Sequence, residues 1–232
     1  MSEERIKKLR KLQGDAEGIY GNIEWNMKGL IMSAVLVFNP RFLFLQSIPK
    51  VISVDGLNID GFEVFGLTLR EYERENRAKE LIAAAKRALI CESLEVGADL
   101  LVRCARILSS GKDPYESNNY FTANISELWS TSKGKAGRLI AAEDRAFVES
   151  CAAPLRHWIR HNNGKIPPKE TLYYDGSPRG RRVQVQLEWK QDSDNDINDI
   201  KLPLAMAYNI FWTIREMILS GIKKAVSNAE SN

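Results

Sequence analysis

Histidine, cysteine and long apolar stretches are scarce in this sequence, and each shortage excludes a class of protein. The three cysteines among 232 residues are odd in number and widely spaced, so neither a disulfide framework nor a CxxC-type zinc site is expected. The longest apolar stretch, residues 30–38, is far shorter than the ~20 residues that a membrane-spanning helix needs. The charged start at Met1 has no signal-peptide core. These absences predict a cytoplasmic protein with no membrane partner.

Both histidines of the chain fall in one short segment, residues 155–165, with the sequence LRHWIRHNNGK. They are four residues apart and would share a helical face, but zinc needs at least one further protein ligand and no cysteine or third histidine is nearby. Gly-rich phosphate loops, GxSxG elbows and HExxH motifs are missing as well. The acidic run at residues 192–199 has Ile197 and Pro203 where a calcium loop needs glycine and glutamate. We therefore expect no metal site and no cofactor.

Positive charge is concentrated in one part of the chain, although the net charge is only +3. Between residues 151 and 182 seven basic side chains face only two acidic ones, so this segment can form a surface for a polyanion. A solvated basic face would have the same composition. The basic residues are Arg156, Arg160, Lys165, Lys169, Arg179, Arg181 and Arg182.

Apolar residues recur at helical spacing through most of the sequence, which predicts a mainly α fold. The glycines at 14, 18 and 21 suggest a break in the first helix, and Gly97 suggests a division of the second. Pro154 should kink the third helix or begin a new segment there, because proline lacks a backbone N–H. The predicted helical ranges are residues 1–38, 69–109, 136–161 and 202–226, with residues 227–232 frayed.

Strand patterns are short and few. Residues 171–174 and the alternating 183–189 flank a turn-forming stretch and predict a β-hairpin, an insertion at about 166–190 before the last helix. Residues 51–56 suggest a strand and turn, and 63–65 another strand. We expect an N-terminal helical segment with an irregular connection at 1–68 and a helical domain at 69–232.

The histidine segment carries the most specific motif of the chain. Arg156 and His161 are separated by five positions, with the polar His157 after the arginine, and Asn162-Asn163-Gly164 follows as a helix-stop signal. This arrangement, continued by Lys165 and Ile166, resembles the R-polar-xxx-H motif of the HEPN superfamily (higher eukaryotes and prokaryotes nucleotide-binding domain). The helices before and after the motif are similar to the four-helix HEPN bundle, with the hairpin as an insertion.

The resemblance implies a metal-independent endoribonuclease that acts on RNA as a homodimer, with two motifs meeting in one cleft. Such enzymes include toxins with an antitoxin partner and phage-defence effectors with partners in a defence system. Arg156 and His161 would be catalytic, with His157 assisting. The motif departs from the family at two positions, because its polar residue is commonly Asn and because Asn163 replaces a tyrosine found in antitoxin-paired members. The second departure argues against nucleotidylation at that place.

The residues support this chemistry without the family name. RNA cleavage needs a 2′-hydroxyl deprotonated and a leaving oxygen protonated, which an imidazole can do near neutral pH. An arginine fork matches the charge that builds on the phosphorane. Two alternatives stay open, a non-catalytic module that binds nucleic acid or a nucleotide and a structural oligomerisation domain. The residues expected to hold phosphate are Arg160, Asn162, Lys165, Arg179, Arg181 and Arg182.

Overall fold

The computed structural model describes residues 2–38, 51–54, 57–60, 80–108, 139–161, 171–188 and 202–231. The chain divides into two compact units, one formed by Met1–Glu24 with Lys86–Asn232 and the other by Trp25–Ala85. The first unit is mainly helical and has a two-stranded antiparallel hairpin before its last helix, which confirms the predicted fold class at this level. The predicted boundary at residue 68 lies outside the described residues.

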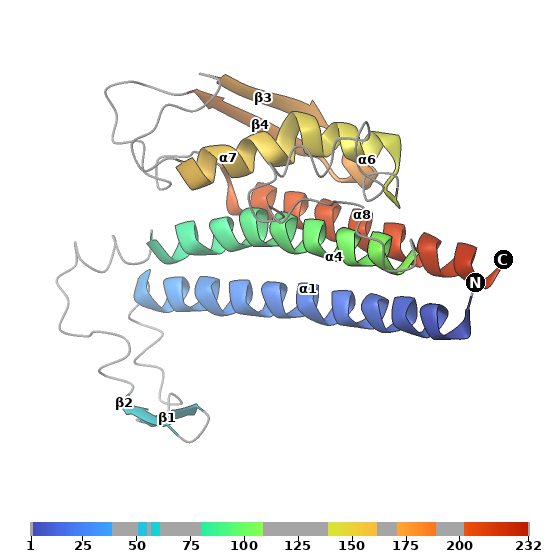
Figure 1. The fold of residues 1–232 in the computed structure, drawn as a ribbon. Helices are drawn as coiled ribbons and strands as arrows, with labels where there is room; N and C mark the ends of the chain where they lie inside the picture. Colours follow the sequence, from blue (N-terminus) through green and yellow to red (C-terminus); the bar gives the residue numbers. More distant parts are fainter. Residues whose placement is uncertain are drawn as a thin grey trace. The chain divides into compact units, whose positions relative to one another are not determined.

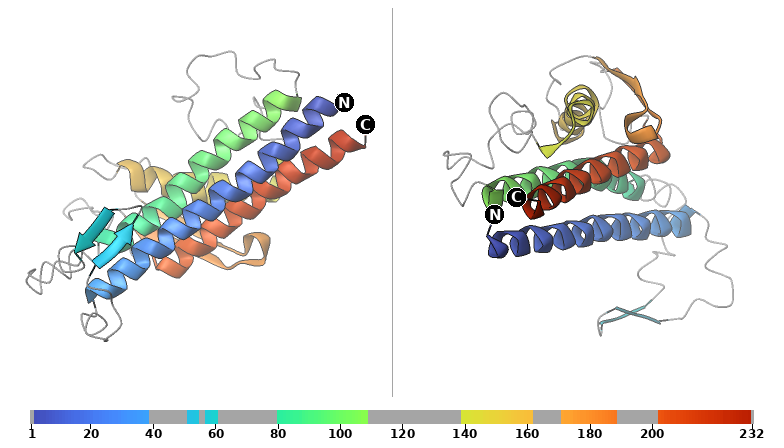
Figure 2. Two further views of the ribbon diagram at one scale, coloured as in Figure 1. Left: turned by 90° about the horizontal axis from the view of Figure 1, so that it is seen from below. Right: turned by 90° about the vertical axis from the view of Figure 1, so that its right-hand side faces the viewer.

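The helices of the first unit run in alternating directions along the chain (Figure 1). The initial part of α1, α4 and α8 lie side by side, and the segment of α6 and α7 lies along α4 and α8 together with the hairpin (Figure 2). Helix α7, which carries the Arg156–His161 motif, packs against the π-helical turn Ala88–Glu92 that leads into α4. The bounds are Glu3–Phe38 for α1, Ser93–Leu108 for α4, Ala142–Phe147 for α6, Ala153–His161 for α7 and Leu204–Glu230 for α8.

Helix α1 is continuous through its three glycines, so the predicted break near Gly14, Gly18 and Gly21 is wrong. All three glycines lie on the exposed face, where a side chain would meet nothing within 4 Å. The opposite face is apolar at helical spacing and is buried, and this packing outweighs the low helix propensity of glycine. Its buried residues in this unit are Leu9, Leu12, Ala16, Tyr20 and Ile23.

Gly97 does not divide the second helical region, contrary to the sequence prediction. The interruption is a π-helix, η2 (Ala88–Glu92), between a helical stretch at residues 80–87 and α4. Gly97 lies inside α4, where its missing side chain makes room for the buried hydroxyl of Tyr20. That hydroxyl donates a hydrogen bond to the carbonyl oxygen of Ser93 at 3.0 Å. The glycine thus serves close packing between α1 and α4.

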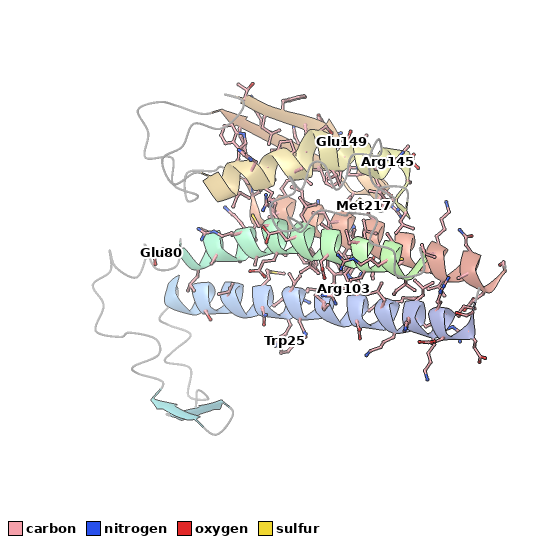
Figure 3. The ribbon with its side chains drawn as sticks, viewed as in Figure 1. Trp25, Glu80, Arg103, Arg145, Glu149 and Met217 are labelled. Atoms are coloured by element: carbon pink, nitrogen blue, oxygen red, sulfur yellow. The ribbon has the colours of Figure 1, made fainter. Side chains whose placement is uncertain are left out.

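Helix α8 supplies the largest share of the core of this unit. Its apolar face is fully buried, and Met217 on this face is labelled in Figure 3. The helix continues to Glu230, so the expected fraying from Ser227 is wrong up to that residue. Arg10 of α1 bonds the Glu230 carboxylate at 2.7 Å and ties the two chain ends together. The core residues of α8 include Ile210, Phe211, Ile214, Met217, Ile218 and Ile222.

The three cysteines are free thiols and are buried in the core as small apolar side chains. Burial raises the pKa of the Cys104 and Cys151 thiols to about 12. A thiol with so high a pKa is protonated at neutral pH and is a poor nucleophile. These thiols therefore contribute packing to the core and no chemistry.

The predicted hairpin is confirmed as β3 (Thr171–Gly176) paired with β4 (Val183–Glu188). The pairing runs from Thr171↔Glu188 to Gly176↔Val183. The aliphatic residues of both strands are buried, whereas Tyr173 is exposed; the buried residues are Leu172, Val183, Val185 and Leu187. The ring of Tyr174 contacts Phe147 of α6 edge-on, with 5.5 Å between ring centroids. The hairpin is thus a covering layer fixed to α6 and α8, and residues 166–170, 189 and 190 of the predicted insertion lie outside the described residues.

The second unit contains the remainder of α1 and a small hairpin. Strands β1 (Val51–Val54) and β2 (Leu57–Asp60) are antiparallel, with Val54 opposite Leu57. The predicted strand at the start of residues 51–56 is confirmed, whereas β2 was not predicted. The strand expected at residues 63–65 lies outside the described residues.

The packing at Gly97 predicts opposite effects for alanine at two glycines. A Cβ at Gly97 would lie 2.8 Å from the Tyr20 hydroxyl and 3.0 Å from Ile218, so Gly97→Ala should lower the free energy of unfolding by about 1–3 kcal/mol. Gly18→Ala is the matched control, because it adds a methyl to open space in a helix and should raise stability by about 0.5–1 kcal/mol. Urea unfolding followed by circular dichroism measures both, and equal changes of the same sign would contradict this account.

Candidate functional site

The motif lies on α7, which begins directly after a second π-helix, η4 (Val148–Ala152). Pro154 has no N–H for the carbonyl four residues earlier, and the wide π turn accommodates this defect just before the proline. The interruption expected at Pro154 thus takes the form of a π turn followed by a new α segment. The α-helix preceding it begins at Ala142, later than the predicted residue 136.

Arg156 is held by a carboxylate from another helix. Its Nε and Nη2 both donate to Oε1 of Glu95 on α4, at 3.1 and 2.9 Å. The side chains of the two residues are only 22% and 31% exposed, so the pair is partly shielded from solvent. The contact uses one edge of the planar guanidinium. It fixes both the position and the plane of the arginine relative to α4.

The other motif residues follow Arg156 along the same helix. His157 is half-buried, and His161 is the last residue of α7. The two histidine positions are four apart and therefore share a face of α7. The side chains of Arg160 and His161 lie outside the described part of the chain, as do Asn162 and Lys165 entirely.

Arg179 is held by a buried carboxylate from another part of the fold. Its Nε bonds Oδ1 of Asp144 at 2.8 Å and its Nη1 bonds Ser220 at 3.0 Å, so it joins the hairpin turn to α6 and α8. Asp144 is buried, with only 3% of its side chain exposed. Hydrogen bonding to this carboxylate raises the pKa of the Arg179 guanidinium. Arg179 also adopts a positive φ of 52°, which is uncommon for a residue with a side chain.

The two other arginines of the turn are also engaged within the chain. Arg182 pairs with Asp175 of the same hairpin at 2.6 Å. The guanidinium of Arg181 lies 5.1 Å from the ring centroid of Trp212 on α8. Arg179, Arg181 and Arg182 are all exposed, and each has a defined contact within the chain.

The hairpin arginines and the motif lie at opposite ends of the α6–α7 segment. Arg179 is fixed to Asp144 near the start of α6, whereas His161 is the last residue of α7. At about 1.5 Å of rise per residue these positions are about 25 Å apart along the helix. Figure 1 shows the turn end of the hairpin beside α6, far from the end of α7. Within one chain the basic segment is therefore divided into two separate places.

Glu95 and Asp144, the carboxylates that pair with Arg156 and Arg179, share a sequence pattern by which they could have been identified. Glu95 falls on the apolar stripe of its helix that includes Cys91, Ala98 and Val102, all of them buried. Asp144 occupies the same kind of position three, four and seven residues before buried apolar side chains. A carboxylate within an apolar stripe predicts a buried cationic partner, because an unpaired charge there would be costly. Trp212, the aromatic partner of Arg181, has no comparable pattern in the sequence. The stripe that follows Asp144 contains Phe147, Val148 and Cys151.

No family model, curated protein or solved structure matches this chain.

The described ranges contain neither a metal-ligand cluster nor a membrane-spanning helix. In those ranges no three His, Cys, Asp or Glu side chains are grouped so that they could hold a metal ion. Among the same residues no helix is both long enough and apolar enough to cross a membrane.

The contrast between Arg179 and Arg182 predicts unequal contributions to stability. Arg179→Ala would leave the buried Asp144 carboxylate unpaired and should lower the free energy of unfolding by about 3 kcal/mol, the lower end for a broken buried pair, since Arg179 is 32% exposed. Arg182→Ala removes an exposed pair from the same turn and should cost no more than about 1 kcal/mol. Thermal and urea unfolding compare the two. Equal losses would show that the Asp144 contact has no special role.

Proposed function

We propose that this chain is a metal-independent endoribonuclease of the HEPN type. The observation that carries the proposal is the arrangement on α7, where Glu95 fixes Arg156 and His161 is the last residue of the same helix. The helices that precede and follow α7 run in alternating directions, which is compatible with a HEPN-like bundle.

The proposed chemistry divides between the arginine and the histidine. Glu95 binds the Nε–Nη2 edge of Arg156, so the Nη1 side of the guanidinium is outside that contact and can donate to a phosphate oxygen. There it would stabilise the charge that builds on the phosphorane. At a helix C-terminus the imidazolium form of His161 is favoured, which suits a general acid for the leaving oxygen. Glu95 acts through Arg156 and is a positioning residue.

A second copy of the chain completes the site in this proposal. Arg156 and His161 are five residues apart, so their positions differ by about 140° around the helix axis. One helix therefore presents few groups to a single phosphate. A two-fold dimer would place the same arginine and histidine of a second chain beside the first pair, and one histidine of the two could then serve as base.

The remaining motif residues receive supporting roles in the proposal. His157 assists His161 from the same helical face, and Arg160, Asn162 and Lys165 hold phosphate near the motif. Arg179 and Arg182 are reassigned to folding, because both pair with carboxylates of their own chain. An RNase of this kind would act as a toxin or phage-defence effector, with an antitoxin or defence-system protein as partner.

Cleavage of RNA in the presence of EDTA tests the function. Purified protein should cut structured RNA without added metal and leave 2′,3′-cyclic phosphate or 3′-phosphate ends, because the 2′-hydroxyl is the nucleophile. His161→Ala should slow single-turnover cleavage by roughly 10²-fold or more, the scale for a positioned acid or base. Product ends are identified by mass spectrometry of short fragments.

The control is Arg103→Ala, which removes an arginine from α4 that pairs with Asp99 on its own helix. It should cleave like the unchanged protein. Activity that appears only with a divalent metal, or that survives in His161→Ala, would contradict the proposed mechanism.

A second candidate is a non-catalytic module that binds nucleic acid. It is favoured by the Glu95 contact itself, since a neighbouring carboxylate offsets the charge of Arg156. Tight binding of RNA by the unchanged protein, without any cleavage, would identify this alternative.

A further inference from the structure

An arginine–aromatic surface lies on α8 and the hairpin turn, away from the motif. Two guanidinium groups lie over the indole ring of Trp212, that of Arg215 at 4.3 Å from the centroid and that of Arg181 at 5.1 Å. We call Arg181, Trp212 and Arg215 the Trp212 platform. Trp212 is itself half-buried beside the rings of Tyr208 and Phe211, with centroids 6.0 and 6.2 Å away. The indole therefore has a fixed orientation.

The platform holds Arg181 in place without neutralising it. Of the four arginines here, Arg179 pairs with Asp144, Arg182 with Asp175 and Arg215 with Glu216. Arg181 is exposed, and in the described part of the chain it has no carboxylate partner. The side-chain amide of Asn209 on α8 donates a hydrogen bond to the carbonyl oxygen of Arg182 at 3.0 Å, which keeps the turn against α8. A charged planar group is thus positioned on an aromatic ring and open to solvent.

Arg215 is held in the platform by contacts with two neighbouring side chains. Its Nε is buried and has no hydrogen-bond partner within the described residues, while its Nη1 bonds Glu216 at 2.7 Å. The contact with the indole and the hydrogen bond to Glu216 therefore hold the guanidinium from two sides. Here the guanidinium of Arg215 stays against the indole and supports its orientation.

We propose that the Trp212 platform binds an unpaired nucleotide of single-stranded RNA. A base stacks on the outer face of the Arg181 guanidinium, which the indole supports from behind, and the N–H groups of Arg181 donate to the adjacent phosphate. Naming RNA as the ligand rests on the proposed function. The site would bind substrate RNA away from the motif, because the hairpin turn and His161 lie at opposite ends of the α6–α7 segment.

The chemistry of the platform favours a nucleotide over an acidic peptide. A carboxylate of an acidic peptide would use only the positive charge of an arginine. Arg179 and Arg182 of this turn already bind carboxylates of the chain itself in that way. An unneutralised guanidinium supported by an indole adds a flat stacking face beside the charge. A nucleotide uses both, through its base and its phosphate.

A comparison of two probes tests the platform separately from catalysis. Fluorescence anisotropy measures binding of a short labelled oligodeoxyadenylate and of an abasic chain of equal length, neither of which has the 2′-hydroxyl that the cleavage step needs. Arg181→Lys keeps the charge and loses the planar face. It should weaken binding of the adenylate probe by roughly fivefold to a hundredfold, the range for one stacked base, and leave the abasic probe nearly unchanged.

Arg182→Lys is the matched control, because it alters the neighbouring arginine that pairs with Asp175, and both probes should bind it as before. Circular dichroism checks that each variant is folded. Because Arg181 is exposed, its replacement should have little effect on stability. Equal affinity of the unchanged protein for both probes, equal weakening of both probes by Arg181→Lys, or full adenylate binding by Arg181→Lys would overturn the proposal. RNA cleavage in EDTA is measured in a separate experiment. If only the ribonuclease proposal fails, cleavage is absent while the two probes still bind differently.

Discussion

The ion pair between Arg156 and Glu95 is the contact on which the proposed chemistry depends. It joins the motif helix to α4 and fixes the arginine by two hydrogen bonds to one carboxylate oxygen. Both residues belong to α segments that directly follow a π-helix, η2 before Glu95 and η4 before Arg156. Because a π turn widens the helix and shifts the register of all later residues, these two turns help to set how the pair meets.

A second buried carboxylate fixes the hairpin in a similar way. Asp144 holds Arg179 and thereby keeps the turn on α6 and α8, while the apolar faces of β3 and β4 cover the core. The same anchoring places Arg181 over Trp212. The described basic side chains are thus divided between two places, the motif on α7 and the Trp212 platform on α8 and the hairpin turn.

The parts of the fold that depend on periodicity could be predicted from the sequence. The hairpin, the last helix and the helical motif segment follow from apolar spacing and turn residues, and the described structure has all three. The helix breaks could not be placed from the glycines. In α1 the buried opposite face outweighs the low helix propensity of glycine, and in α4 Gly97 makes room for the Tyr20 hydroxyl. The sequence predicts that Arg156 and His161 lie on one helix. It does not show that Glu95 pairs with Arg156 or that Asp144 pairs with Arg179, because these pairs are tertiary contacts. The place of these two carboxylates within apolar stripes is the signal that could have identified them.

A double-mutant cycle on single-turnover RNA cleavage tests most directly whether Glu95 works through Arg156. Glu95→Gln, Arg156→Lys and the combined variant are compared with the unchanged protein, with folding checked by circular dichroism. If Glu95 only positions the arginine, Glu95→Gln should slow cleavage by about tenfold in the unchanged protein and have almost no further effect beside Arg156→Lys. Additive losses, or a Glu95→Gln variant that cleaves at the original rate, would contradict the account.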